Sequence, residues 1–228
     1  MKKDYINIID YGVGNTFSIS KSIEHLNFKC NFVKKRSDLI KNKKIILPGV
    51  GSFPDCVKLL KKNKLHLSII EEVNKGTSLL GVCVGMQLLM NYSFEIKKTM
   101  GLSLIDGYVQ KIKSDKINKV PNIGWRQVKF DNKFFKNKKN FFYFVHSYKL
   151  VLKNKKIQVG YIKYGNNIIP ASIKKDNIHG CQFHPEKSGK DGLSFLKKFL
   201  DEKEDKNFIL CRRLWKFRTK YFPYKNFR

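Results

Sequence analysis

The chain has 228 residues and a formal net charge of +29, from 47 Lys and Arg against 18 Asp and Glu. This length suits a single α/β domain with a sizeable core. No run of about 18 apolar residues occurs, and Asp4 and Asp10 interrupt the segment where a signal peptide would be apolar, which argues against membrane-spanning and secreted proteins and predicts a cytoplasmic one.

The first half of the sequence alternates short apolar runs with segments of helical spacing. YINIID ends at the turn YGVGN, and Ile19, Ile23 and Leu26 then repeat at helical intervals. Strands separated by helices require right-handed crossovers, which predicts a parallel sheet with helices on both faces and sites at the carboxyl ends of its strands. Strands are expected at 5–10, 28–33, 44–47 and 77–83, and helices at 18–26, 53–60, 65–73 and 85–90.

The second half of the sequence is strand-rich. The Lys/Asn-rich segment 131–140 is expected to be a solvated hairpin loop, and one helix is expected at 192–200. Neither an internal repeat nor a linker rich in Ser and Pro is visible. Strands are expected at 106–113, 125–130, 141–152, 157–165, 168–175 and 178–183.

The high positive charge raises nucleic-acid binding as a hypothesis from another class of protein. Only six of the 47 cations are Arg, however, and Lys is spread along the whole chain. Because diffuse lysine is typical of a solvated surface, nucleic-acid binding is kept only as an alternative. Membrane binding is not expected. Four of the six Arg fall in the last 18 residues, where the composition shifts.

Cys83 lies where an apolar strand meets the start of a helix, in GVCVGMQLLM. Gly81 and Gly85 permit a crowded turn that would lift the Cys83 side chain out of the core, and the helix dipole would favour the thiolate. A small buried core cysteine is the competing interpretation. The five cysteines are an odd, scattered set, so reduced thiols are expected in place of a disulfide framework.

A nucleophilic thiolate needs an acid and base partner, which a third group usually orients. His184 and Glu186 in CQFHPE offer both, although a surface His-Pro turn is the plainer interpretation of that hexapeptide. His146 is a weaker candidate, because alternation in its apolar strand suits a core histidine equally well. A metal site is not expected, since alternation places Cys181 and His184 on opposite faces of the strand and no second pair of ligands is present.

An oxyanion formed at Cys83 would require two amide donors. The amide of Val84, directly after the nucleophile, can supply one. The other can come from the Val50 to Gly51 region of PGVG, where Gly49 also provides flexibility, although PGVG could be an ordinary strand-to-helix loop. The GVG in YGVGN lacks the third glycine of a dinucleotide fingerprint.

These motifs together resemble the class I (triad) glutamine amidotransferases. GVCVGMQLL resembles their nucleophile motif, HPE their His/Glu pair and PGVG their oxyanion strand. Across residues 5–200, DYGVGN, PGVGSF, PNIGWRQV, YFVHSY and GCQFHPEKSG resemble the glutaminase subunit of imidazole glycerol phosphate synthase, an enzyme of histidine biosynthesis. The resemblance implies a three-layer, flavodoxin-like class I glutaminase fold with a mostly parallel central sheet, without a metal or cofactor.

The resemblance also implies roles for individual residues. Cys83, His184 and Glu186 would form the catalytic triad. Glutamine would be recognised by a set of residues around it: Gly49, Gln87, Glu95, His146, Ser147 and Tyr148.

Family members form heterodimers with a (βα)8-barrel synthase that receives the ammonia. Trp125 and Lys187 match positions expected near that interface, although a core indole and a free surface lysine are equally compatible with the sequence. Asn122 and Arg126 are placed there too, but they depart from the family's usual P-H-x-G-W-N. This departure leaves open a paralogous role, supplying ammonia to aminate or amidinate a surface-polysaccharide sugar.

The end of the chain has no counterpart in the family. The amidotransferase domain is expected to span 1–201, followed by a basic extension over 202–228. The extension could be disordered, could form an amphipathic helix at 208–218 or could contact a partner.

Overall fold

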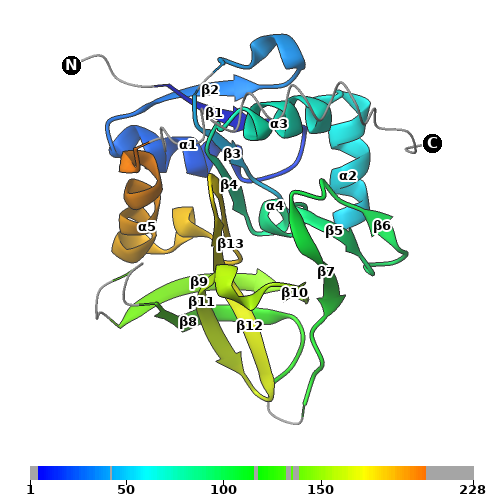
Figure 1. Ribbon diagram of the computed structural model, residues 1–228. Coiled ribbons are helices and arrows are strands. Elements are labelled where there is room, and N and C mark those ends of the chain that lie inside the picture. The colour runs from blue at the N-terminus through cyan, green and yellow to red at the C-terminus, as the bar shows by residue number, and fades with distance from the viewer. Residues whose placement is uncertain (1–4, 42, 116–117, 132–134, 136–138, 204–228) are drawn as a thin grey trace.

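The centre of the molecule is a nine-stranded mixed sheet (Figure 1). The computed structural model describes residues 5–41, 43–115, 118–131, 135 and 139–203. The first five strands of the sheet are parallel, in the order that doubly wound flavodoxin-like sheets adopt, and the last four extend it antiparallel. In spatial order the strands are β2 (Lys29–Val33), β1 (Tyr5–Ile9), β3 (Ile45–Leu47), β4 (Leu79–Val82), β13 (Ile178–Cys181), β12 (Asn167–Lys175), β11 (Gln158–Tyr164), β8 (Asn122–Phe130) and β9 (Asn140–His146).

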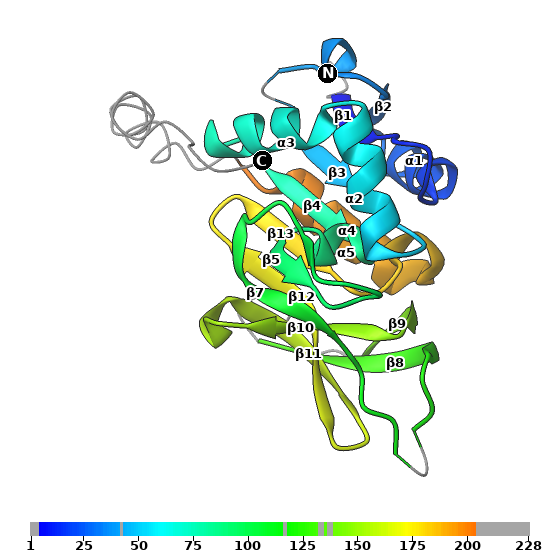
Figure 2. The ribbon, with the colours of Figure 1, turned by 90° about the vertical axis from the view of Figure 1, so that its right-hand side faces the viewer.

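Helices cover both faces of the parallel part of this sheet, as the sequence predicts. α1 (Thr16–His25) and α5 (Gly189–Asp201) lie on one face, and α2 (Phe53–Lys62) and α3 (Leu65–Asn74) lie on the other (Figures 1 and 2). The three-layer α/β architecture is therefore confirmed. None of the helices in the described ranges combines the length and the apolar surface that a bilayer-spanning helix requires.

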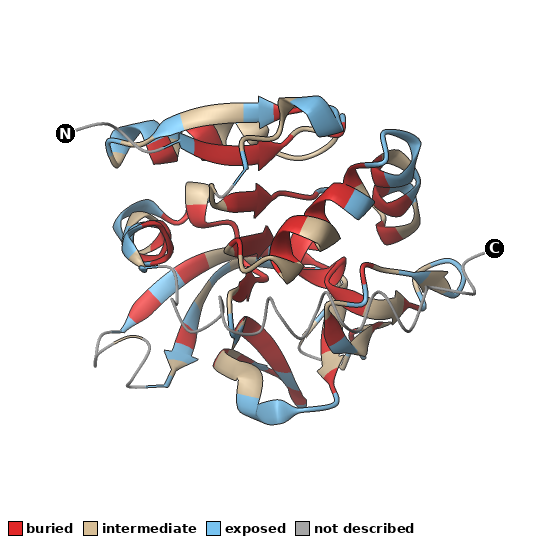
Figure 3. Cartoon of the chain, turned by 45° about the horizontal axis from the view of Figure 1, so that its top comes forward, coloured by how far each residue is buried: buried red, intermediate tan, exposed pale blue. Residues whose placement is uncertain are grey.

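The core is built from strands that are apolar on both sides. β3 and the Leu79–Val82 strand are buried along their whole length, which explains why IIL and LLGV read as unbroken apolar runs (Figure 3). α2 buries one stripe, including Phe53 and Leu60, and presents lysines to solvent. Its first turn is capped by the Ser52 side chain, which accepts a hydrogen bond from the Asp55 amide at 3.3 Å.

A second, smaller sheet interrupts one expected strand. The segment 141–152 forms two strands, because the chain leaves the large sheet after β9 and enters the small one at Ser147. There the Ser147 carbonyl accepts a hydrogen bond from the Ile112 amide at 2.8 Å. The small sheet has the order β10 (Tyr148–Leu152), β7 (Ile105–Lys111), β5 (Met90–Ser93) and β6 (Thr99–Met100).

The prediction of a helix at 85–90 is wrong over the second half of that segment. α4 (Val84–Gln87) is a single turn, and β5 begins at Met90. Leu88, Leu89 and Met90 are all fully buried, so an apolar run of this kind is compatible with either conformation. Pairing with β7 decides it, since Met90 lies opposite Ile105 in the small sheet.

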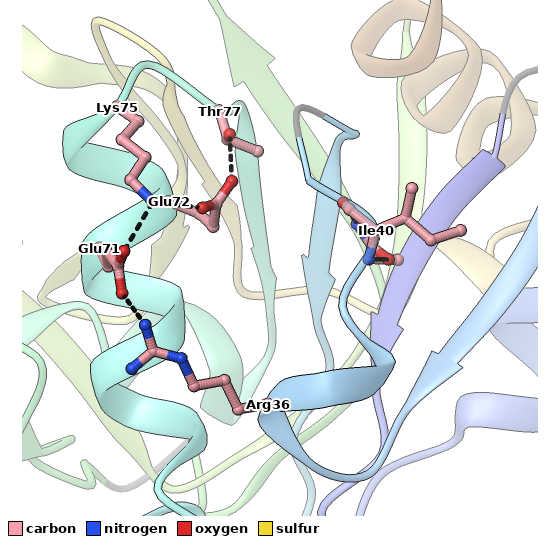
Figure 4. Close-up of polar contacts among 7 residues, drawn as sticks. Arg36, Ile40, Glu71, Glu72, Lys75 and Thr77 are labelled. Atoms are coloured by element: carbon pink, nitrogen blue, oxygen red, sulfur yellow. Dashed lines mark hydrogen bonds and ion pairs between the residues drawn. The ribbon is translucent and has the colours of Figure 1, made fainter.

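A polar network joins the C-terminal part of α3 to the short helix η1 (Arg36–Asp38), which follows β2 (Figure 4). The Glu71 carboxylate accepts hydrogen bonds from Arg36 and Lys75, both at 2.6 Å. The buried Glu72 carboxylate accepts from Lys75 at 2.9 Å and from the Thr77 hydroxyl at 3.2 Å. Thr77 lies two residues before β4, so its bond to Glu72 fixes the chain where it enters that strand.

Two predicted segments, the loop at 131–140 and the extension, lie mostly outside the described residues. The remaining short helices are η2 (Lys155–Ile157) and η3 (Pro185–Lys187). Most of the expected loop at 131–140 lies outside the described residues, although the strands that it joins, β8 and β9, do pair antiparallel. α5 ends at Asp201, and the proposed extension lies outside the described residues from position 204 onward.

Candidate active site

Cys83 occupies a strained turn between β4 and α4. Its backbone has φ 55° and ψ −112°, a conformation that residues other than glycine rarely adopt. A Cβ atom on Gly81 would lie 2.6 Å from the Gly85 carbonyl oxygen, and one on Gly85 would collide with the Leu47 carbonyl. The two glycines are therefore required by close backbone packing, and the turn that they permit places the buried Cys83 in the wall of a cavity.

The turn faces a cavity of about 350 Å³ at the carboxyl ends of the parallel strands. Its wall brings together segments far apart in the sequence, and Gly49 and Glu186 are the only predicted catalytic, oxyanion or substrate residues outside it. Gly49 packs against the turn, where a Cβ would lie 2.7 Å from the Gly85 amide nitrogen. The lining residues are Val50, Gly51, Cys83, Val84, Gln87, Glu95, Pro121, Val145, His146, Ser147, Tyr148 and His184.

His184 and Glu186 form a buried pair behind the cavity. His184 Nδ1 donates a 2.8 Å hydrogen bond to Glu186 Oε1, and the Glu186 side chain is fully shielded from solvent. His184 Nε2 has no hydrogen-bond partner in the described part of the chain, so it is available to the cavity that it shares with Cys83. Burial alone would lower the pKa of His184, but the neighbouring Cys83 and Glu186 raise it to about 10. The imidazole can therefore hold a proton beside the sulfur.

Asn15 is a site residue that the sequence interpretation missed. Its Nδ2 donates a 3.3 Å hydrogen bond to Glu186 Oε1, so it helps to orient the carboxylate that orients His184. A sequence signal did exist, because Asn15 ends the DYGVGN turn after β1. β1 is a parallel strand of the same sheet, and sites are expected at the carboxyl ends of such strands. In the same turn the Tyr11 hydroxyl donates to the Pro48 carbonyl at 2.8 Å, which anchors the start of the PGVG segment.

Gln182 is the second residue that was missed. It is fully buried, and its Nε2 donates to Cys83 Sγ at 3.7 Å while its Oε1 accepts from Gln87 Nε2 at 3.0 Å. Strand alternation could have identified it, because residues 182 and 184 share a face. The Gln182 amide thus presents a hydrogen-bond donor to the Cys83 sulfur.

Glu95 places a carboxylate in the cavity wall. Its Oε2 accepts a 2.8 Å hydrogen bond from the Phe53 amide at the start of α2. Burial raises the pKa of Glu95, against the opposing effect of the Phe53 hydrogen bond. A half-buried carboxylate held in this way can bind a cationic group such as an ammonium.

The outer side of the β8–β9 hairpin carries a group of apolar side chains that we call the aromatic face. They alternate along paired strands, with Trp125 opposite Tyr143 and their rings 6.1 Å apart. Trp125 is 52% exposed, which rules out the core-indole interpretation. Lys187 is also exposed. The aromatic face comprises Ile123, Trp125, Phe141, Tyr143 and Val145.

Asn122 and Arg126, expected at the partner interface, lie on the other side of β8. Asn122 is fully buried and pairs with His146 across the hairpin. Arg126 lies opposite the buried Phe142, and its guanidinium stacks over the Tyr164 ring at 5.4 Å. The structure therefore corrects the expected surface role of Asn122 and directs both side chains away from the aromatic face.

Cys30, Cys56, Cys83 and Cys181 carry free thiols, in agreement with the expected reduced state. Cys211 lies outside the described residues. Within the described ranges, no group of three or more His, Cys, Asp and Glu side chains is arranged to hold a metal ion.

Proteins of known family resemble this chain over most of its length. The family model for glutamine amidotransferase class-I matches residues 7–203. The imidazole glycerol phosphate synthase subunit HisH of Caldanaerobacter subterraneus subsp. tengcongensis is 42% identical over 198 residues, which cover 85% of this chain and 96% of that protein. The HisH subunit of Lactococcus lactis subsp. lactis is 38% identical over 206 residues, covering 89% and 100%.

Solved structures support the same fold. A crystal structure of a glutamine amidotransferase matches with a TM-score of 0.65 and 16% identity, covering 86% of this chain and 97% of that one. The structure of PurLQS from Thermotoga maritima matches with a TM-score of 0.64 and 20% identity, covering 87% and 98%. Together with the extent of the family match, these similarities show that the chain belongs to the class I glutamine amidotransferase family.

Proposed function

We propose that this chain is the glutaminase subunit of imidazole glycerol phosphate synthase, a cytoplasmic enzyme that hydrolyses glutamine and passes the ammonia to a (βα)8-barrel synthase subunit. The observation that carries this proposal is the cavity in which Cys83, on its strained turn, meets His184 with its buried carboxylate partner. The HisH names and extensive similarity of the relatives support the histidine pathway over the surface-polysaccharide alternative.

In the first half of the proposed reaction, Cys83 Sγ attacks the side-chain amide carbon of glutamine. The carbonyl oxygen becomes an oxyanion, for which the proposed donors are the Val84 amide and the Val50 to Gly51 region, all in the cavity wall. The carbon–nitrogen bond then breaks as His184 Nε2 gives its proton to the departing nitrogen, releasing ammonia and leaving a γ-glutamyl thioester.

In the second half, water attacks the thioester carbon. His184 Nε2, now unprotonated, takes a proton from the water, the carbon–sulfur bond breaks, and glutamate leaves. Glu186 keeps the imidazole oriented by accepting the Nδ1–H bond in both halves. We propose that the Glu95 carboxylate pairs with the ammonium of glutamine, with Gln87 and the segment 146–148 lining the rest of the substrate site.

The aromatic face is the proposed docking surface for the barrel subunit. Exposed aromatic and aliphatic side chains on a sheet are typical of a protein interface, in which Trp and Tyr supply much of the binding free energy. Val145 belongs both to this face and to the cavity wall, so a partner bound there would lie next to the cavity. That position suits the transfer of ammonia without loss to solvent. Lys187, at the end of the catalytic His-Pro-Glu segment, is a second proposed contact.

The test is reconstitution of the full chain with a histidine-pathway barrel subunit and its phosphorylated ribosylamino substrate. We expect one glutamate for each imidazole glycerol phosphate formed. The Cys83→Ala variant should form that product only when an ammonium salt replaces glutamine. Glutamine-dependent synthesis that persists in Cys83→Ala would contradict the proposal, and turnover only with a sugar-modifying partner would favour the alternative pathway.

A further inference from the structure

An unbroken series of hydrogen bonds, which we call the amide chain, joins the inner side of β8 to the sulfur of Cys83. Three bonds run from β8 to the small sheet: Arg126 Nε to Asn122 Oδ1 at 3.1 Å, Asn122 Nδ2 to His146 Nε2 at 3.0 Å, and His146 Nδ1 to the Tyr148 carbonyl at 2.8 Å. Three more continue through Gln87 Nε2, which donates to the Tyr148 carbonyl and to Gln182 Oε1, and end at Cys83 through Gln182 Nε2.

Two independent contacts assign the same tautomer to His146. A carbonyl oxygen can only accept, so the bond to Tyr148 places the proton on Nδ1. Arg126 Nε can only donate, so it occupies Asn122 Oδ1 and turns Asn122 Nδ2 toward the ring. His146 Nε2 must then accept. The neutral Nδ1–H tautomer satisfies every contact. In an imidazolium the Nε2–H donor would face the Asn122 Nδ2–H donor, and that bond would be lost.

Burial and charge agree with this assignment. The desolvation of His146 lowers its pKa to about 4; the hydrogen bond to the Tyr148 carbonyl opposes this shift, and the charged groups His184 and Arg126 add to it. Arg126 itself is held firmly, because its Nη1 and Nη2 donate to the Trp125 and Ile123 carbonyls at 2.9 and 3.1 Å. The guanidinium is thus a fixed reference from which the Asn122 amide takes its orientation.

The far end of the amide chain fixes a donor at the nucleophile. Gln87 Nε2 is held by the Tyr148 carbonyl, and it occupies Gln182 Oε1. Gln182 therefore has only its Nε2–H group to offer to Cys83 Sγ. The amide chain thus fixes which Gln182 group faces the sulfur that attacks the substrate in the proposed reaction.

We propose that Asn122 and Arg126 are positioning residues for the glutaminase reaction: they fix His146 in its Nδ1–H tautomer and thereby orient the Gln182 amide toward Cys83. Neither residue touches the reacting atoms. The proposal rests on the proposed glutaminase function for its kinetic consequence, but its structural consequence at His146 can be measured without turnover.

The sharpest test is Asn122→Asp, which keeps the shape of the side chain and replaces the donor by an acceptor. His146 Nε2 would then have to be protonated to make the bond. The matched control is Asn167→Asp, at a buried amide outside the amide chain. Its Oδ1 accepts from Lys149 at 2.9 Å and its Nδ2 donates to the Lys113 and Tyr164 carbonyls at 2.9 and 3.3 Å, so this substitution also replaces a buried donor by an acceptor. Nitrogen-15 NMR of the His146 ring reports its tautomer and protonation, and glutamine turnover with the synthase subunit present reports kcat and KM.

We expect wild type and Asn167→Asp to show neutral Nδ1–H His146 at pH 7 and equal kcat. Asn122→Asp should show a cationic His146 and a kcat lower by about tenfold to a hundredfold, the range for a displaced reacting group. Arg126→Met, which leaves the charge of position 122 unchanged, should mix the His146 tautomers and lower kcat less. In the Asn122→Leu background, Arg126→Met should have little further effect on kcat.

A neutral, unchanged His146 in Asn122→Asp would overturn the tautomer assignment. A changed His146 with kcat within about twofold of wild type would overturn the positioning role. An Arg126→Met effect on kcat that is as large in the Asn122→Leu background as in wild type would also overturn it. If wild type itself produced no glutamate with its partner, the proposed function would fail, while the NMR result would still decide the assignment.

Discussion

The imidazole of His184 and the carboxylate of Glu186 are joined by a 2.8 Å hydrogen bond, and both side chains are buried. Because Glu186 binds Nδ1, the other ring nitrogen is left for the cavity. The two residues are two positions apart, and η3 begins between them at Pro185, so the backbone holds the pair together before any substrate binds.

Replacement of Glu186 by Gln should lower kcat far more than it changes KM. The amide keeps the shape of the side chain but removes the Glu186 charge, which together with Cys83 raises the pKa of His184. We expect a loss of about 10²- to 10⁴-fold, the range for a misdirected general acid and base. Steady-state glutamate release in the presence of the partner measures it. An effect confined to KM would assign Glu186 to substrate binding instead.

Replacement of Gly85 by Ala should unfold or distort the turn that carries Cys83. The added Cβ would collide with the Leu47 carbonyl, which lies in a fully buried strand and cannot move aside. We expect a loss of about 3 kcal/mol in the free energy of unfolding, at the upper end for overpacking. Urea denaturation monitored by circular dichroism provides the measurement. A variant as stable as wild type would show that the backbone packing at the turn is looser than the structure indicates.

The meeting of Cys83, His184 and the other predicted residues in one cavity could be predicted from sequence because each is tied to a local signal. Gly81 and Gly85 flank Cys83, and Pro185 marks the end of the strand that carries His184. The carboxyl ends of parallel strands then bring these segments together whatever the details of packing.

The remaining features depended on tertiary contacts. No local signal tells that the chain changes sheets at Ser147, because the residues on both sides are equally strand-like. The inward direction of Asn122 follows from the pairing register with His146, which the sequence does not reveal. Asn15 was missed for the same reason, since its partner Glu186 is 171 positions away.

Replacement of Trp125 by Ala should weaken binding of the barrel subunit while leaving the fold intact. A half-exposed indole at the centre of an interface typically contributes about 2 kcal/mol or more, equivalent to about a thirtyfold increase in Kd. Isothermal titration calorimetry measures the change. Ile168→Ala is the matched control, because Ile168 is 50% exposed on β12, outside the aromatic face. Equal affinities for the two variants would place the interface elsewhere.

His179 should make the protein less stable in mild acid. Burial lowers the pKa of His179 to about 4, although Glu202 opposes the shift. Between that value and about 6.5, the unfolded chain binds a proton that the folded chain excludes, so stability is lost as the pH falls, by up to about 1.4 kcal/mol per pH unit.

His179→Gln should therefore flatten the pH dependence of the free energy of unfolding between pH 7.5 and pH 5. His146 has a similarly lowered pKa and would remain, so part of the slope should persist in the variant. Urea denaturation at the two pH values compares wild type with His179→Gln. Identical slopes would mean that His179 is protonated in the folded state as readily as in the unfolded one.

The most direct test of the account is the site of reaction with a glutamine-mimicking electrophile, determined by peptide mass spectrometry on the full chain bound to its synthase subunit. We expect a single adduct, on the peptide that contains Cys83, formed at a rate that falls in His184→Ala and prevented by excess glutamine. Modification of another cysteine with Cys83 left intact, or an adduct whose formation glutamine does not prevent, would contradict the assignment of Cys83 as the glutamine-attacking nucleophile.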